Sequence, residues 1–166
     1  MDVTYSIDIE NMKKLIAQCP QVFADEALQL LREVVTVLEG KVVEHTPVGV
    51  GGEAGLRGSI SSDAYIRARE IVGTVGTPLA YGEVVERGRT ANQAMPPVEA
   101  LIPWVRAKLD VPEKEVRSVA FLVARSIGKK GFKGADMFAK GFNETEPWIM
   151  TQLRGLPARV AARLVE

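Results

Sequence analysis

The feature that most constrains the fold of this chain is a long amphipathic stretch from Gln21 to His45. Apolar residues recur there at steps of three and four, the spacing of one helix face: Ala27, Leu31, Val34, Leu38 and Val42. At about 1.5 Å per residue the predicted helix spans roughly 35 Å. Thr46-Pro47 ends it, because the residue before a proline is pushed out of the helical region. A helix of this length needs a partner for its apolar face.

Upstream, alternating residues predict a short strand from Val3 to Ile7, and a short helix follows from Ile9 until it stops near Cys19-Pro20. Downstream, residues 59–66 and 70–77 predict a β-hairpin, and Tyr81 to Glu86 predicts a third strand or an irregular extended arm. Four predicted helices complete the chain. They cover residues 97–109, residues 112–128 with Gly128 as the terminator, residues 136–142, and a last stretch that opens at Pro147 and that Gly155 and Pro157 should kink or break.

These elements predict a single α+β domain over residues 1–166, with the long helix and the C-terminal helices packed on a small antiparallel β-sheet. Its segments are an N-terminal strand and short helix (1–20), the long helix (21–45), the hairpin and extended arm (59–88) and a helical part (97–165). Phe121 and Leu122 lie off the apolar stripe of their helix, which indicates burial on more than one side.

The composition limits the possible chemistry. Cys19 is the only cysteine and His45 the only histidine, so an internal disulfide is excluded, a reducing compartment is favoured and a structural zinc site is not expected. No apolar run reaches the length of a membrane span, and the acidic N-terminus is unlike a signal peptide.

Three loose motif matches lack the context that their chemistry needs. Gly49-Val50-Gly51 with Ala54 follows a helix rather than a strand, and the glycines of residues 128–134 lack the P-loop spacing. Ser126 and Lys129 form an S-x-x-K match at a helix end. We therefore expect no catalytic, metal or cofactor site and no enzymatic activity.

Charge is unevenly distributed along a chain whose net charge is zero. The basic excess gathers between Arg117 and Lys140, and Lys129, Lys130 and Lys133 lie on a glycine-rich connector beside Phe132. These residues could contact DNA phosphates, with Phe132 as a stacking group, or passively line a channel that DNA crosses. The same charge split could orient identical subunits head to tail, or it could be a solvated helix face.

The stretch from Ala80 to Trp104 indicates a surface that docks a partner more than a catalytic site. It joins an extended arm, a polar loop and a helix that begins at Pro96-Pro97. The wider order of motifs resembles the neck or tail-completion family (minor tail component) of long-tailed, lambda-like bacteriophages over roughly residues 24–142. The motifs are a long helix ending in His45-Thr46-Pro47-Val48, Leu56-Arg57-Gly58-Ser59-Ile60, a hairpin, Tyr81-Gly82-Glu83-Val84-Val85-Glu86-Arg87-Gly88, Pro96-Pro97, Trp104 and Ala120 to Ile127 leading to Lys130-Gly131.

The resemblance implies a non-enzymatic virion protein, made in the host cytoplasm, that completes the head-proximal end of the tail so that heads and tails join. It implies a homo-oligomeric ring, six-fold before twelve-fold, that contacts a tail terminator or head-completion ring, with no membrane partner. The hypothetical partner-binding residues are Leu56, Arg57, Tyr81, Glu86, Arg87, Arg89, Pro96 and Pro97.

Two rival functions stay open at this point. A nucleic-acid-binding accessory protein would use the basic loop 128–134, and a small enzyme would need a pocket that gathers His45, Tyr81 and carboxylates. The neck assignment instead predicts that residues 48–58 and 87–95 are mobile in the free protein and protected in the assembly.

Overall fold

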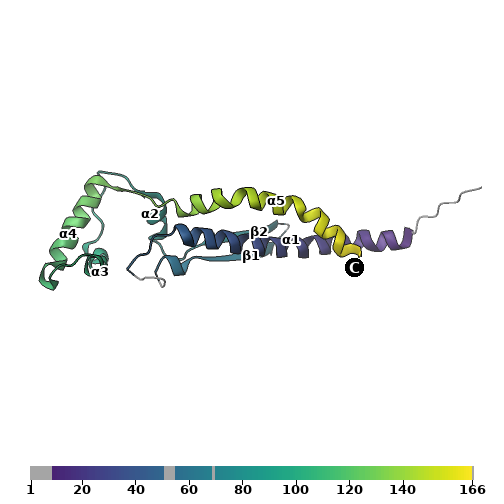
Figure 1. Cartoon of the computed structure of the whole chain (residues 1–166), viewed down its shortest axis with the longest axis horizontal. Helices are drawn as coiled ribbons and strands as arrows, with labels where there is room; N and C mark the ends of the chain where they lie inside the picture. Colours follow the sequence, from purple (N-terminus) through teal and green to yellow (C-terminus); the bar gives the residue numbers. More distant parts are fainter. Residues whose placement is uncertain (1–8, 51–54, 69, 166) are drawn as a thin grey trace, which may run out of the picture.

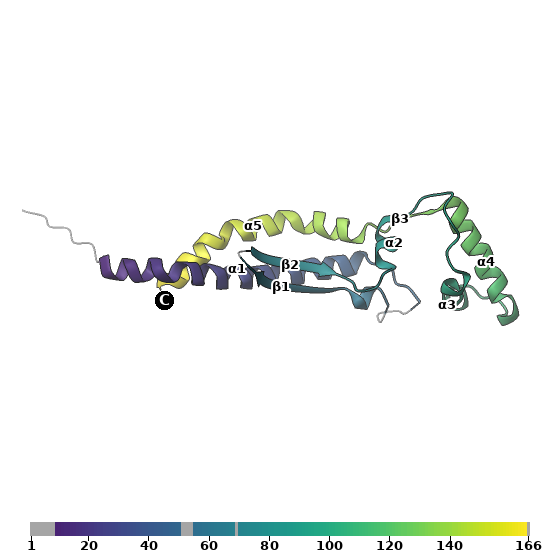
Figure 2. The same cartoon turned by 180° about the vertical axis from the view of Figure 1, so that it is seen from behind.

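The computed structural model describes residues 9–50, 55–68 and 70–165, with side chains described from residue 17 onward except for Gln18. It is elongated (Figures 1 and 2). Two long helices, α1 (Ile9–His45) and α5 (Met137–Val165), run antiparallel, and the hairpin of β1 (Ser61–Arg67) and β2 (Glu70–Gly76) covers α1. Helices α3 (Val98–Lys108) and α4 (Glu113–Lys130) pair with each other at one end. The predicted α+β class is confirmed.

Short elements join these parts. They are a 3₁₀ turn η2 (Arg57–Ser59), helix α2 (Gly82–Arg87), and strands β3 (Gly88–Arg89) and β4 (Phe132–Lys133), which pair with each other. We call α1, β1, β2, α2 and α5 the body, and α3 with α4 the helical unit.

Helix α1 is one helix where the sequence predicted two. The expected stop near Cys19-Pro20 is wrong, because α1 continues through Pro20 to His45. A proline inside a helix removes one backbone hydrogen bond and costs about 3 kcal/mol. The helix persists because the part after Pro20 is fixed along α5, by contacts that lie far away in sequence. The strand predicted at residues 3–7 lies outside the described residues.

Near the end of α1, the two long helices approach until backbone meets backbone. A Cβ added to Gly141 would lie 3.0 Å from the Val42 nitrogen and 3.2 Å from its Cα. Beside this contact the buried Thr46 hydroxyl donates to the Val42 carbonyl at 2.7 Å and lies 3.2 Å from the Met137 sulfur. Val42 and Met137 are fully buried and form a core with Leu56 and Ile60.

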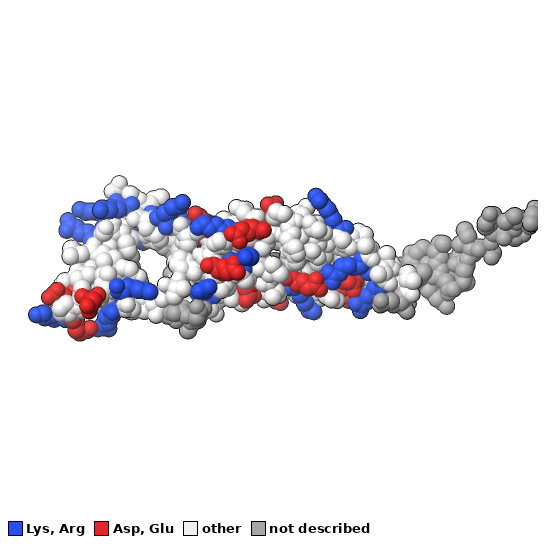
Figure 3. Space-filling view, viewed as in Figure 1, with Lys and Arg blue, Asp and Glu red and all other residues white. Residues whose placement is uncertain are grey.

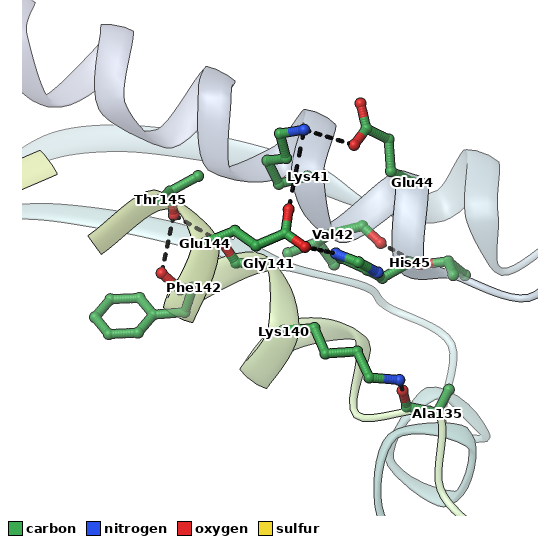
Figure 4. A network of polar contacts seen from close by, with 11 residues as sticks. Lys41, Val42, Glu44, His45, Ala135, Lys140, Gly141, Phe142, Glu144 and Thr145 are labelled. Atoms are coloured by element: carbon green, nitrogen blue, oxygen red, sulfur yellow. Dashed lines mark hydrogen bonds and ion pairs between the residues drawn. The ribbon is translucent and has the colours of Figure 1, made fainter. Parts of the chain in front are cut away.

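Polar contacts surround this crossing (Figure 4). His45 Nε2 lies 2.8 Å from Glu144 Oε1, and Lys41 Nζ lies 2.7 Å from Glu44. The hydrogen bond from Lys41 lowers the pKa of Glu44 below its ordinary value. These groups are exposed or half-buried, so they orient the helix ends more than they stabilise them.

Farther along the two helices, two arginines of α5 form ion pairs with two glutamates of α1. Arg163 Nη1 donates to the buried Glu26 at 2.6 Å, and Arg159 forms paired hydrogen bonds to Glu33 at 3.0 and 3.1 Å. The hydrogen bond from Arg159 lowers the pKa of Glu33. Burial of the Glu26 carboxylate is tolerated because Arg163 and Arg159 both lie beside it.

The hairpin was predicted correctly, and its register runs from Ser61 opposite Gly76 to Arg67 opposite Glu70. Gly73 allows β2 to lie close against α1, since an added Cβ would meet the Val35 side chain at 2.6 Å.

The expected strand or irregular arm at Tyr81 to Glu86 is wrong, because residues 82–87 form helix α2. The β-branched pair Val84-Val85 favours a strand locally. The helix instead forms around Gly82, which is buried against Thr77 and Leu56, and it ends at Gly88 with a φ of 73°.

The C-terminal region also differs from its prediction of a short helix followed by a second one. Helix α5 runs unbroken from Met137 to Val165 through Pro147 and Pro157, and it bends toward its C-terminal end (Figure 1). Contacts with α1 on both sides of Pro147, at Gly141 and at Arg159, hold both halves of α5 against α1.

The Gly141 crossing predicts opposite effects for two substitutions in α5. Gly141→Ala forces a methyl group into the Val42 backbone and lowers the free energy of unfolding by about 1–3 kcal/mol. Gly155→Ala, where nothing lies within 4 Å of the added Cβ, raises it by up to about 1 kcal/mol through helix propensity. Urea denaturation followed by circular dichroism measures both. Equal effects at the two positions would contradict the close approach.

Candidate functional site: an apolar cleft between two cores

The body and the helical unit have separate hydrophobic cores. The core of the helical unit is formed by Val105, Val116 and Ala120, with partly buried neighbours on α3 and α4. The stripe predicted for α3 therefore packs against α4. Since each part has its own core, the relation between them depends on the segments that join them.

Two connectors, residues 88–97 and 131–136, lie side by side. Gly88 and Arg89 pair with Lys133 and Phe132. Backbone hydrogen bonds extend this pairing in both directions: Gln93 N to Gly128 O at 3.0 Å, Asn92 N to Lys129 O at 3.2 Å, Ala135 N to Val85 O at 2.8 Å and Asp136 N to Glu86 O at 3.1 Å. The arm and the basic connector, about forty residues apart in sequence, thus form one joint.

Glycines make this joint possible. A Cβ on Gly88, Gly131 or Gly134 would overlap the backbone of the opposite connector. Gly128 was expected to end α4, and this is wrong, because α4 continues to Lys130 and Gly128 packs against Gln93 and Met95. Helix α4 ends instead at Gly131, whose φ is 64°. Close backbone packing therefore accounts for the glycine-rich composition of this connector.

An apolar cleft of about 870 Å³ lies between the two parts. The body side includes Leu56, Tyr81, Val84 and Val85, and the opposite side includes Pro96, Pro97, Trp104, Ile127 and Phe132. Several of these side chains are exposed, with Tyr81 at 50% and Val84 at 42%. A contiguous apolar surface of this kind is typical of a binding site.

Arg89 is the single charged residue among the described residues that line the cleft. Its Nη2 donates to the Ala94 carbonyl, while its Nε is buried without a hydrogen-bond partner. A buried donor left unsatisfied costs about 1–3 kcal/mol. The cleft therefore contains a cation with donor capacity that the described residues do not use.

The cleft gathers five of the eight residues expected to bind a partner: Leu56, Tyr81, Arg89, Pro96 and Pro97. The other three lie elsewhere and have contacts within the chain. Glu86 accepts hydrogen bonds from the Phe138 and Ala139 amides at the start of α5, Arg87 lies 3.2 Å from Glu83, and Arg57 Nε donates to the Val43 carbonyl.

Sequence reasoning did not single out the cleft residues Val84, Ile127 and Phe132 as partner-binding. Trp104 lies in the stretch from Ala80 to Trp104 and off the apolar stripe of α3, and this position was the signal that could have identified it. The expected burial of Phe121 and Leu122 is wrong, since they are 44% and 60% exposed; the face of α4 that packs against α3 carries Val116 and Ala120 instead.

The basic residues of the connector form a separate surface. Lys129 and Lys130 end α4, Lys133 lies in β4, and all three are exposed without an ion-pair partner among the residues that the structure describes. Arg125, one turn earlier, shares this property. Figure 3 shows lysine and arginine side chains gathered at this end of α4.

The structure does not bring together His45 and Tyr81, the two residues that the enzyme hypothesis placed in one pocket. Tyr81 lines the cleft, whereas His45 lies outside it beside Glu144. Within residues 9–50, 55–68 and 70–165, no three His, Cys, Asp or Glu side chains are grouped as metal ligands. The same residues contain no helix long and apolar enough to cross a membrane.

The paired connectors predict a sharp effect at Gly134. Gly134→Ala places a methyl group against the Glu86 and Gly88 backbone, so the connectors separate and the amides of Gln93, Ala135 and Asp136 exchange at least about tenfold faster. Hydrogen–deuterium exchange measures this, and Gly49→Ala, with open space around the added Cβ, serves as the control. Unchanged protection in Gly134→Ala would contradict the joint.

Comparison with known proteins gives one match. The family model described as "Bacteriophage HK97-gp10, putative tail-component" matches residues 9–88. No curated protein and no solved structure matches the chain. The matched segment begins with α1 and ends at Gly88, where the chain leaves the body for the helical unit. Residues 9–88 are therefore similar to the bacteriophage tail components that this family model describes.

Proposed function

We propose that this chain is a structural, non-catalytic virion protein that completes the head-proximal end of a phage tail, so that heads and tails join at the neck. The family match of residues 9–88 carries the proposal, because it is to a phage tail component. The apolar cleft supports it, since a preformed apolar surface suits a protein that acts by docking.

The protein acts as a homo-oligomeric ring that contacts a tail terminator or head-completion ring. Six-fold symmetry of the ring is favoured over twelve-fold symmetry. The elongated shape has unlike ends, with α3 and α4 at one and the long helices at the other (Figure 1), which favours contacts between unlike surfaces. Such contacts close into rings when the rotation allows it. The whole chain works as a single domain, with the connectors setting the position of the helical unit.

Deleting the gene tests the proposal. We expect filled heads and unattached tails in the lysate, and joined virions after purified protein is added. Negative-stain electron microscopy counts both species, and a tail-fibre deletion is the control for a defect unrelated to joining. Normal virions without the protein would overturn the neck assignment.

The exposed basic surface favours a second function, contact with DNA. Lys129, Lys130 and Lys133 carry charge that no described residue neutralises, and Phe132 between them is 41% exposed. Cations of this kind contact phosphates, and an exposed ring stacks on bases.

This second function predicts a local charge effect. Lys129→Gln with Lys130→Gln weakens binding to a DNA duplex and reduces the salt slope by about 1.8, at about 0.9 per lost phosphate contact. Adding Lys133→Gln extends the loss. Lys108→Gln with Lys114→Gln, an equal charge change elsewhere on the helical unit, leaves the slope unchanged. Fluorescence anisotropy from 50 to 200 mM salt measures it, and equal slopes in all variants would contradict direct DNA contact.

A further inference from the structure

We infer that the apolar cleft of one copy receives the outer face of α5 from a second copy, with Glu146 of that face meeting Arg89 of the cleft. This inference rests on the proposed ring and names the surfaces that would hold it together.

The outer face of α5 is a stripe that its own chain does not cover. Phe142, Glu146, Met150 and Leu153 follow one another at steps of four, four and three, so they share one helix face. The apolar members are exposed, at 48% for Phe142, 44% for Met150 and 43% for Leu153. Figure 4 shows the Phe142 ring directed away from α1. We call these four residues the α5 stripe.

The charges of the two surfaces are complementary. Glu146 is the one charged member of the α5 stripe, and its carboxylate has no hydrogen bond or ion pair with any residue in the described part of the chain. Arg89 is the one charged residue among the described lining of the cleft, and it has no acidic partner there. An apolar helix face with one acid therefore matches an apolar groove with one arginine, as in helix-in-groove recognition.

The α5 stripe cannot fill the cleft of its own chain. Helix α5 is fixed along α1 by the Gly141–Val42 contact and by the Arg159–Glu33 hydrogen bonds, which hold the stripe on the outside of the body. Contact between the stripe and a cleft therefore joins different surfaces of two copies. Such a contact is heterologous and repeats from one subunit to the next.

Cysteine pairing tests the contact in assembled tails. In a Cys19→Ser chain, Val84→Cys marks the cleft and Met150→Cys marks the stripe; the chain complements the deletion phage, and purified tails are oxidised. Non-reducing electrophoresis should show a ladder from dimer to the full ring. Tails that contain a mixture of the two single-cysteine chains should give dimers only. Thr151→Cys, one position from Met150 but on another face, should give at least tenfold less product with Val84→Cys.

Charge reversal provides a second test. Arg89→Glu or Glu146→Arg alone should reduce the cross-linked fraction at least tenfold, and the two together should restore it. Tails that still join heads but show no Val84–Met150 product would overturn this inference and leave the proposed function standing. Equal products from Met150→Cys and Thr151→Cys, or no rescue by the double reversal, would also overturn it. A gene deletion with normal virions would instead remove the neck assignment.

Discussion

The close approach of α5 to α1 at Gly141 is the constraint on which the rest of the structure depends. Because Gly141 has no side chain, the start of α5 lies against the Val42 backbone, and Met137 reaches the core with Leu56 and Ile60. The start of α5 is also where Glu86 caps the Phe138 and Ala139 amides, so α2 and α5 are tied together. The connectors leave the body from these same two elements. The position of the helical unit thus follows from one helix crossing.

The two connectors transmit that position through backbone contacts, since the α3–α4 core shares no residue with the body core. Glycines serve here to let chains pair closely, at Gly88, Gly131 and Gly134. A side-chain core between the two parts would have closed the cleft. Pairing by backbone instead holds the parts together while leaving apolar surface on both, and that surface lines the cleft.

Local patterns predicted the elements that local patterns control. The spacing of apolar residues predicted α3 and the centre of α1, and the two alternating runs predicted the hairpin.

Prediction failed where contacts between residues far apart in sequence decided the structure. Pro20 and Pro147 looked like helix boundaries, but both helices continue through these prolines, and contacts between α5 arginines and α1 acids fix the two helices against each other. Gly128 looked like a terminator, and its role became visible only beside Gln93 and Met95. Four of the expected partner-binding residues in the stretch from Ala80 to Trp104 line the cleft, and Leu56 joins them from outside that stretch, but no sequence pattern could show that Glu86 turns away to cap α5.

The extent of the family match has a structural meaning. It covers α1, the hairpin and α2, and it stops at the first residue of β3. The body side of the cleft, including Leu56, Tyr81 and Val84, therefore lies inside the family segment, and Pro96, Trp104 and Phe132 lie outside it. The α5 stripe also lies outside the match. The segment that resembles the family thus supplies one wall of the cleft, and the helical unit, which has a core of its own, supplies residues of the other wall.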